Sequence, residues 1–234
     1  MDGSNLAKQL DRSDVLARFR EDFRLPAGGI YLDGNSLGPL CHRAKAMLDA
    51  AVASWETRGI GGWLESASPW FDLTDRVSAS LAPLVGAEPE EVVVANSTTV
   101  NLHQMLSTFY APSGARRRIV VDATAFPTDR YAIDSHCRMR DIDAADGVRV
   151  VPTRDGRTMD ECDITSAFDE TVQLAILPSV IYTSGQLLDV ASLVRAAHAK
   201  GVVIGFDCSH SAGVVPHQLS ESGADFAFFC TYKY

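Results

Sequence analysis

The chain has 234 residues, of which 46% are hydrophobic, and its formal net charge at pH 7 is −9. This apolar fraction is typical of a globular protein with a sizeable core. The negative charge argues against a nucleic-acid or membrane-surface partner, although Arg116, Arg117 and Arg118 form a short basic patch. The sequence has no run of eighteen apolar residues and no apolar amino-terminal signal segment. We therefore expect a soluble, cytoplasmic protein that binds neither nucleic acid nor membranes.

The five cysteines, at positions 41, 137, 162, 208 and 230, are odd in number and include no C-x-x-C pair. This pattern favours free thiols in a reducing compartment over a disulfide framework or a zinc site. A metal site built on Asp207 and His210 lacks a convincing third ligand. We therefore expect no bound metal.

Amphipathic spacing predicts three helices in the first third of the chain. Charged and apolar residues alternate over residues 11–23, which indicates a short surface helix. A short strand over residues 30–32 leads through a glycine-rich turn to Pro39, which opens a second helix that ends at Gly59. The third helix is expected over residues 71–85.

From residue 92 onward, apolar runs alternate with helical patterns, as in doubly wound folds. The charge-rich stretch over residues 140–171 indicates either a strand pair or an irregular excursion. We expect an α/β fold with a three-layer, doubly wound and mainly parallel sheet. Strands are predicted over residues 92–95, 118–122, 172–177, 201–207 and 226–230, and helices over residues 100–109 and 190–200.

An acid and a lysine follow the last two predicted strands. Asp207 ends one strand and Lys233 stands just beyond the other. Ligands of open α/β sheets collect at the carboxyl ends of the strands, so both side chains should face one crevice. An amine can form a Schiff base with pyridoxal phosphate, and an acid can keep the pyridine nitrogen protonated. The alternative, from this stretch alone, is an ordinary acid and a surface lysine.

Two upstream segments strengthen the cofactor hypothesis. Ser97, Thr98 and Thr99 lie between a predicted strand and a predicted helix, where backbone N–H groups and the helix dipole favour a phosphate. Simple capping of the helix is the alternative. The turn Phe126–Asp129 offers an aromatic face and a carboxylate, although alone it is only a turn. The sequence has no G-x-G-x-x-G, P-loop or G-x-S-x-G motif, which disfavours nucleotide binding and serine hydrolysis.

Five segments together resemble the kynureninases, which are fold-type I pyridoxal phosphate enzymes of the class V aminotransferase group. The resemblance is spread over almost the whole chain. The D-x-x-H and Tyr-Lys motifs also fit several related families, whereas the N-S-L-G and F-P-T-D motifs together point more specifically to the kynureninases. The matching segments are Tyr31–Pro39, Ala95–His103, Phe126–Asp129, Gly205–Gly213 and Thr231–Tyr234.

The resemblance implies a role for each matching residue. Lys233 would form the Schiff base, Asp207 would pair with the pyridine nitrogen, and Tyr232 would contact the phosphate and relay protons. Ser36 and Trp63 would meet the amino acid part and the aromatic ring of the substrate. One departure concerns the hydroxyl expected directly after the strand that ends at Leu177, because Pro178 precedes Ser179 here. The implied cofactor-binding residues are Thr98, Thr99, Phe126, Pro127, Thr128, Asp129, Asp207, His210, Tyr232 and Lys233.

The implied activity is hydrolysis of L-kynurenine or its 3-hydroxy form to anthranilate or 3-hydroxyanthranilate and L-alanine, in tryptophan catabolism. The family resemblance also implies a homodimer with its active site at the interface. Another class V enzyme, such as an aminotransferase, a cysteine desulfurase or an epimerase, is the nearest alternative. A non-catalytic binding module or degenerate paralogue is another.

The resemblance also predicts the domain organisation. Residues 1–60 would form an amino-terminal segment with helices, and residues 61–234 would form part of the large cofactor-binding domain. Because a chain rarely ends directly behind a central strand, the large domain is expected to be incomplete at its carboxyl end. A small carboxyl-terminal domain, with the residue for the substrate carboxylate, would lie beyond residue 234.

Overall fold

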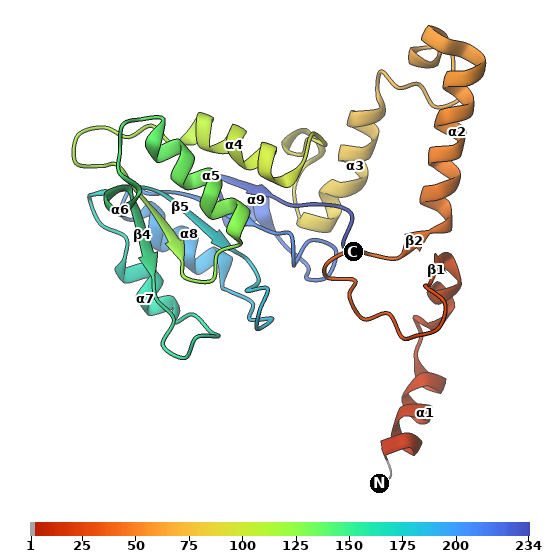
Figure 1. Ribbon diagram of the computed structural model, residues 1–234, viewed down its shortest axis with the longest axis horizontal. Helices are drawn as coiled ribbons and strands as arrows, with labels where there is room; N and C mark the ends of the chain where they lie inside the picture. Colours follow the sequence, from red (N-terminus) through yellow and green to blue (C-terminus); the bar gives the residue numbers. More distant parts are fainter. Residues whose placement is uncertain (1–2) are drawn as a thin grey trace. The chain divides into compact units, whose positions relative to one another are not determined.

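A computed structural model describes residues 3–234 (Figure 1). The chain divides into two compact units, Met1–Leu73 and Thr74–Tyr234. Each unit is considered by itself below.

The first unit is built from helices and short extended segments. It contains helix α1 (Gly3–Ser13), the 3₁₀ helix η1 (Ala17–Asp22), the antiparallel strands β1 (Phe23–Arg24) and β2 (Leu40–Cys41), helix α2 (His42–Arg58) and the 3₁₀ helix η2 (Gly59–Trp63). The prediction of one helix over residues 11–23 was wrong, because α1 ends at Ser13 and a turn precedes η1. The strand expected over residues 30–32 is irregular, with its apolar side chains largely exposed.

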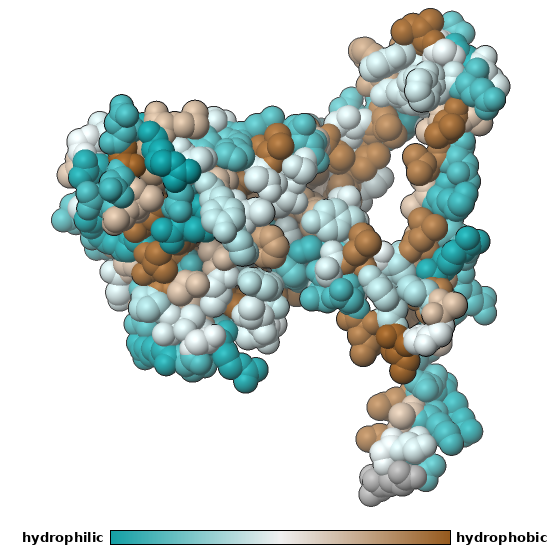
Figure 2. All heavy atoms as spheres, in the orientation of Figure 1, coloured by the Kyte–Doolittle hydropathy of each residue, from teal (hydrophilic) through white to brown (hydrophobic). Residues whose placement is uncertain are grey.

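Helix α2 carries an apolar stripe that the first unit leaves in contact with solvent. The helix ends at Gly59 as predicted but begins at His42 instead of Pro39. Its four large apolar residues, Met47, Leu48, Val52 and Trp55, are 53–69% exposed. Figure 2 shows brown, apolar spheres along this helix. Within the described residues of the first unit, none of these four side chains is therefore part of a buried core.

The second unit holds a parallel sheet in the strand order β4-β3-β5-β6-β7. All four neighbouring strand pairs are parallel. Its elements are α3 (Leu73–Val85), η3 (Pro89–Glu91), α4 (Thr98–Phe109), β3 (Arg118–Asp122), α5 (Pro127–Arg138), α6 (Ala144–Gly147), β4 (Val148–Val151), α7 (Glu161–Ser166), β5 (Val172–Pro178), α8 (Val190–His198), β6 (Val203–Asp207), α9 (Leu219–Ser222) and β7 (Phe226–Phe228).

The strand order places a switch point between β3 and β5. The chain first moves outward from β3 to β4, then returns to β5 and continues through β6 to β7 in the other direction. The loops that leave β3 and β5 therefore diverge, and this divergence opens a crevice at the carboxyl ends of the two strands. Ligand sites of doubly wound sheets lie in such crevices.

Two apolar clusters cover the two faces of the sheet, which confirms the three-layer prediction. Side chains alternate along each strand, so that Ile119 and Val121 pack with α4 and α5, whereas Val120 faces the opposite layer. That second layer is formed by α3, α7, α8 and α9. Both clusters are formed by residues from Val85 onward. The sheet is thus buried on both faces, as parallel sheets require.

Two expectations for the second unit need correction. Residues Val92–Ala95 are extended but belong to no strand, and Val93 is 71% exposed, because within residues 3–234 no neighbouring strand supplies hydrogen bonds. The stretch 140–171 is not a strand pair. It contains α6, the edge strand β4 and α7. Among the described residues no helix has the length and apolar character to cross a membrane, and all five cysteines are free.

Candidate active site

Asp207 stands at the carboxyl end of β6 with its side chain half-buried. In the sheet register its neighbours are Pro178 at the end of β5 and Phe228 at the end of β7. The Oδ1 atom of Asp207 accepts a hydrogen bond of 2.8 Å from the backbone N–H of Ser209. This hydrogen bond within the turn after β6 fixes the position of one carboxylate oxygen of Asp207.

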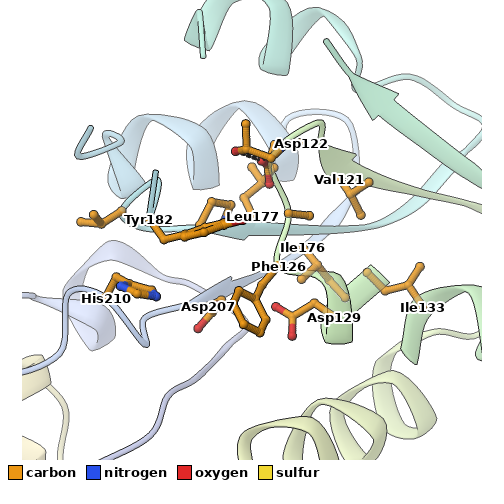
Figure 3. A pocket seen from close by; sticks show the side chains of 14 residues that line it. Val121, Asp122, Phe126, Asp129, Ile133, Ile176, Leu177, Tyr182, Asp207 and His210 are labelled. Carbon is orange, nitrogen blue, oxygen red and sulfur yellow. Dashed lines mark hydrogen bonds between the residues drawn. The ribbon is translucent and has the colours of Figure 1, made fainter. Parts of the chain in front are cut away.

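A cavity lies at the switch point between β3 and β5, beside Asp207 (Figure 3). The enclosed space is about 20 Å³, which one water molecule would fill. A ligand with an aromatic ring therefore requires the half-exposed side chains at the rim to move aside. Lining residues come from the ends of β3, β5 and β6 and the start of α5, and include Asp122, Phe126, Asp129, Tyr182, Asp207 and His210.

Three carboxyl groups converge on this cavity. Asp122 and Asp129 are almost fully buried, with 2% and 5% of their surface exposed. Burial, together with the nearby charges of Asp207 and Asp122, raises the pKa of Asp129 to about 7, and Lys233 opposes the shift. Burial also raises the pKa of Asp122, although hydrogen bonds from Thr124 oppose that shift. At neutral pH, Asp129 thus holds a proton for part of the time.

Lys233 lies next to His210, and the two reach each other from neighbouring strand ends. The Nζ atom of Lys233 is 2.8 Å from Nε2 of His210. Burial lowers the pKa of His210, and the charge of Lys233 lowers it further, so the imidazole is neutral at pH 7. A neutral ring can accept the hydrogen bond that the ammonium group of Lys233 donates. Lys233 therefore contacts His210, and the charge of Asp207 acts on the same imidazole by raising its pKa slightly against the larger effects of burial and Lys233.

Aromatic rings form one wall of the site. The rings of Phe126 and Tyr182 meet edge to face with centroids 5.5 Å apart, and Tyr182 lies 5.7 Å from the His210 ring. Lys233 Nζ lies 6.0 Å from the Phe126 centroid, at the outer limit of a cation–π contact. Phe126 precedes Pro127, the first residue of α5, so that the helix start fixes the position of the ring. Pro127 and Thr128 themselves are exposed.

The predicted anion site lies at the start of α4. Ser97 caps this helix through a hydrogen bond of 3.4 Å from the Val100 N–H to its side chain. The Oγ1 atom of Thr98 is buried and has no hydrogen-bond partner among residues 3–234. Both residues line a groove of about 720 Å³ that Tyr232 also lines. Thr99 is half-buried in the first turn of α4. No described residue lines both this groove and the carboxylate cavity, so the predicted anion site and the cavity are separate parts of the second unit.

Tyr232 is 56% exposed, and its pKa is raised by a hydrogen bond with Cys230 and, to a smaller extent, by partial burial. The hydroxyl therefore stays protonated at neutral pH. The two residues expected to meet the substrate, Ser36 and Trp63, belong to the first unit. Ser36 is exposed within a turn, and Trp63 packs edge to face on Trp70 at 6.2 Å.

Sequence reasoning missed three residues at or near the site, which are Asp122, Tyr182 and His217. Asp122 ends the predicted strand over residues 118–122, which was the available signal for a third acid at the carboxyl edge. Tyr182 and His217 carried no comparable signal, since both follow strands by several residues. The hydroxyl of Ser179 is buried and hydrogen-bonded to Ser211, behind the end of β6.

The chain is similar to a known protein family and to curated proteins over most of its length. The aminotransferase class-V family matches residues 30–234. Over 97% of its length, the chain is 50% identical to the kynureninase of Geobacillus thermodenitrificans and 46% identical to that of Bacillus anthracis. It covers 53% of each relative. The chain therefore spans about half the length of the curated relatives that it matches.

Solved structures of low sequence identity share the fold. The cysteine desulfurase CsdA of Escherichia coli superposes with a TM-score of 0.73 at 18% identity, covering 93% of this chain and 54% of that one. A variant of C-DES, a cystine C–S lyase, with glycine covalently linked to its pyridoxal phosphate cofactor, gives 0.78 at 17%, covering 92% and 55%. These structures support the fold alone, and the family match over residues 30–234 supplies the assignment: the chain belongs to the aminotransferase class-V family.

Proposed function

We propose that the protein is a pyridoxal phosphate-dependent hydrolase that cleaves L-kynurenine or 3-hydroxy-L-kynurenine to anthranilate or 3-hydroxyanthranilate and L-alanine. The observation that carries the proposal is the Lys233–His210 contact beside Asp207 at the carboxyl edge of the sheet. The identity of 45–50% with kynureninases over 97% of the chain supports the choice of substrate.

The described residues fit the cofactor. Thr98 offers a buried hydroxyl without a partner at a helix amino terminus, where a phosphate is favoured. Asp207 offers a carboxylate oxygen for the pyridine nitrogen, and Lys233 an amine for the Schiff base. Thr99, Thr128 and Tyr232 would add contacts around the phosphate, while Phe126 and Pro127 would pack against the ring and Asp129 would lie beside it. When bound, pyridoxal phosphate supplies the electron sink that lets the substrate Cβ–Cγ bond break.

The chain's own side chains would move the protons. Lys233, once displaced from the cofactor by the substrate amine, would take the proton from the substrate α-carbon. His210 stays neutral at pH 7 and can hold a proton of the Lys233 ammonium through Nε2. The hydroxyl of Tyr232 stays protonated and would serve as the donor or relay during bond cleavage. Lys233, Tyr232 and Asp207 are therefore the proposed catalytic residues.

Several further properties belong to this proposal. Ser36 and Trp63 would contact the amino acid part and the aromatic ring of the substrate. A homodimer with its active site at the interface is proposed from the family resemblance, as is a small carboxyl-terminal domain beyond residue 234. The division into residues 1–60 and 61–234 stays a proposal as well. A cytoplasmic location is supported by the five free cysteines.

The first test measures cofactor binding by absorbance. Pyridoxal phosphate added to the protein should give an absorbance band near the edge of the visible range, as expected of a Schiff base with Lys233. Lys233→Ala should abolish this band. Lys200→Ala, which changes an exposed lysine just after α8, is the matched control and should keep it. If the protein shows no band, the cofactor proposal is wrong.

A second assay addresses the substrate. Release of fluorescent anthranilate from L-kynurenine should require Lys233 and added cofactor. A protein that binds the cofactor through Lys233 but releases no anthranilate or 3-hydroxyanthranilate would support another class V activity. That result would contradict the substrate assignment while leaving the cofactor assignment intact.

A further inference from the structure

A chain of buried hydrogen bonds lies directly behind the carboxyl ends of β5 and β6. The Nε2 atom of His217 is 2.7 Å from Oγ of Ser211, and that Oγ is 2.5 Å from Oγ of Ser179. Ser179 also contacts the backbone carbonyl of Asp207, through its N–H at 2.9 Å and its hydroxyl at 3.3 Å. The chain thus connects His217 to the backbone of the cofactor-site acid.

All three polar side chains of this chain are withdrawn from water. Ser179 and Ser211 are fully buried and His217 is 7% exposed. Burial lowers the pKa of His217, which keeps its imidazole neutral. With the Nε2 proton present, His217 donates to Ser211, the Ser211 hydroxyl donates to Ser179 or to the Cys208 carbonyl, and Ser179 donates to the Asp207 carbonyl. This direction satisfies every hydroxyl in the chain, as buried polar groups require.

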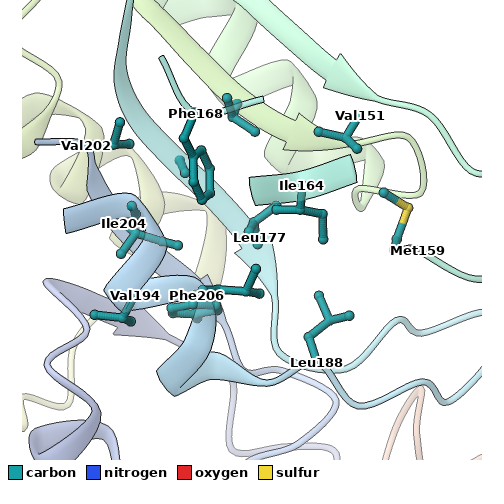
Figure 4. Packing of buried hydrophobic residues seen from close by; sticks show 14 of the residues in the cluster. Val151, Met159, Ile164, Phe168, Leu177, Leu188, Val194, Val202, Ile204 and Phe206 are labelled. Atoms are coloured by element: carbon teal, nitrogen blue, oxygen red, sulfur yellow. The ribbon is translucent and has the colours of Figure 1, made fainter. Parts of the chain in front are cut away.

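The hydrogen bonds tie together the two loops that carry the site. Ser179 begins the loop after β5 and is held to the loop's return by the hydrogen bond from the Leu188 N–H to its carbonyl at 3.0 Å. Ser211 lies in the turn after β6, next to His210, and its hydroxyl is 3.2 Å from the Cys208 carbonyl. The apolar layer includes Leu177 and Phe206 near the strand ends and continues to Leu188 in the loop after β5 (Figure 4). The polar contacts of Ser179 and Ser211 add to this packing at the two loops.

We propose that Ser179, Ser211 and His217 form a positioning network that sets the direction of the Asp207 carboxylate and of the His210 ring. The network touches neither cofactor nor substrate and acts through the backbone of residues 207–211. This inference rests on the proposed function, since it deepens the account of the same site. Its structural part, the coupling of His217 to His210, holds without any cofactor.

The experiment compares Ser211→Ala, His217→Leu and His217→Gln with Ser78→Ala. Ser78 is a buried serine whose hydroxyl lacks a partner in the described part of the chain, so its loss removes no hydrogen bond. Glutamine at position 217 retains a side-chain amide that can donate to Ser211, whereas leucine fills the space without donating.

The first readout is the titration of the His210 ring in the cofactor-free protein, followed by NMR. Ser211→Ala and His217→Leu should shift it by several tenths of a pH unit, because the distances from His210 to Asp207 and Lys233 change. Amide exchange at Ser179 and Cys208 should quicken about tenfold, the size expected for one lost buried hydrogen bond. His217→Gln should restore both values, and Ser78→Ala should change neither.

The second readout is the dissociation constant of pyridoxal phosphate, which should rise about tenfold in Ser211→Ala and His217→Leu and return in His217→Gln. If Ser211→Ala and His217→Leu leave the His210 titration and the amide exchange unchanged, the proposed network is wrong, regardless of the dissociation constant of pyridoxal phosphate. If the variants have a lower melting temperature but an unchanged His210 titration, the network only stabilises the fold, and the proposed positioning role is wrong. If the wild-type protein does not bind pyridoxal phosphate, the proposed function is wrong, and the first readout still decides whether the network exists.

Discussion

Asp129 is the residue whose ionisation links the site most directly to stability. Its pKa in the folded chain is raised to about 7, first by burial and then by Asp207 and Asp122. A raised carboxyl pKa means that the folded state holds a proton that the unfolded state has lost. The stabilising contribution is therefore complete below about pH 4 and is lost as the pH rises through about 7.

Replacing Asp129 with asparagine should remove this pH dependence. At pH 8 the variant should be more stable than the wild type, by on the order of 2–4 kcal/mol, because it buries no charge. The difference should shrink towards pH 4, where both side chains are neutral. Urea denaturation of both proteins at several pH values measures it.

The exposed acid Asp146 provides the control, since Asp146→Asn should alter stability equally at both ends of the range. A constant difference between Asp129→Asn and the wild type from pH 5 to pH 8 would show that Asp129 is ionised throughout. In that case the assignment of a raised pKa to Asp129 in the cavity would be wrong.

Some site residues were predictable from the sequence and others were not, for a physical reason. Asp207, Lys233, Phe126 and Asp129 directly follow or closely adjoin predicted strands, so the geometry of a parallel sheet brings them to one edge. His217 lies ten residues after β6, and only the folded path of that loop brings its ring to Ser211. A linear pattern carries no such information.

At the scale of elements, the pairing of β6 with β7 depends on one glycine. Gly205 lies opposite Phe226 in the register, and a methyl group at position 205 would overlap the Phe226 ring. That ring cannot easily move, because it stacks on Phe109 with centroids 4.8 Å apart. The missing side chain thus lets an aromatic residue pack flat on the sheet.

Gly205→Ala should therefore destabilise the protein by about 1–3 kcal/mol, the usual cost of overpacking. Phe226→Leu alone should also destabilise it, by about 1 kcal/mol, through lost contact area. In the double variant the smaller leucine makes room for the methyl group, so the two losses should be less than additive. Strict additivity in a double-mutant cycle would refute steric overlap as the cause.

Helices α4 and α5 are joined by a polar contact between two histidines. His103 Nδ1 lies 3.0 Å from His136 Nε2, and Arg140 lies 3.0 Å from the other nitrogen of His136. Burial lowers the pKa of His136, and the charges of Arg140 and His103 lower it further. The stability that this neutral ring contributes is present above about pH 6.5 and is lost as the pH falls through its lowered value.

His136→Gln keeps hydrogen-bonding groups at this contact but cannot take up a proton. The variant should lose about 1 kcal/mol at pH 7.5, yet its urea midpoint should fall less than that of the wild type between pH 7.5 and pH 5. His42→Gln, which changes an exposed histidine, should reproduce the wild-type slope. An equally steep loss in His136→Gln would exclude this pair as the source of the acid sensitivity.

The misassigned elements share one cause, which is that a strand depends on its neighbours. Val92–Ala95 has a strand-like sequence, but no strand among the described residues pairs with it, and it lies along a groove beside β7. β4 was hidden in a charge-rich stretch, yet it pairs with β3 over four residues. Local composition predicted the central strands well, because burial on both faces makes them uniformly apolar.

At the scale of the whole molecule, the two units differ in how they exclude water. Within residues 3–73 no apolar side chain is buried, whereas both apolar clusters of the sheet belong to the second unit. The hydrophobic contribution to folding therefore comes from the second unit. Helix α3 contributes Val85 to one of these clusters, although the helix begins at the boundary between the units.

A chain of residues 73–234 should consequently keep the stability of the sheet. We expect it to unfold cooperatively, with a melting temperature within about 5 °C of that of residues 1–234, because no core contact is removed. Residues 98–234 provide the control. This shorter chain loses α3 and the buried Val85, and its melting temperature should fall by about 10 °C or more. Circular dichroism in the near ultraviolet, followed during heating, measures both. If residues 73–234 do not unfold cooperatively, the first unit is needed to form the core. That result would contradict the division of the chain into two compact units.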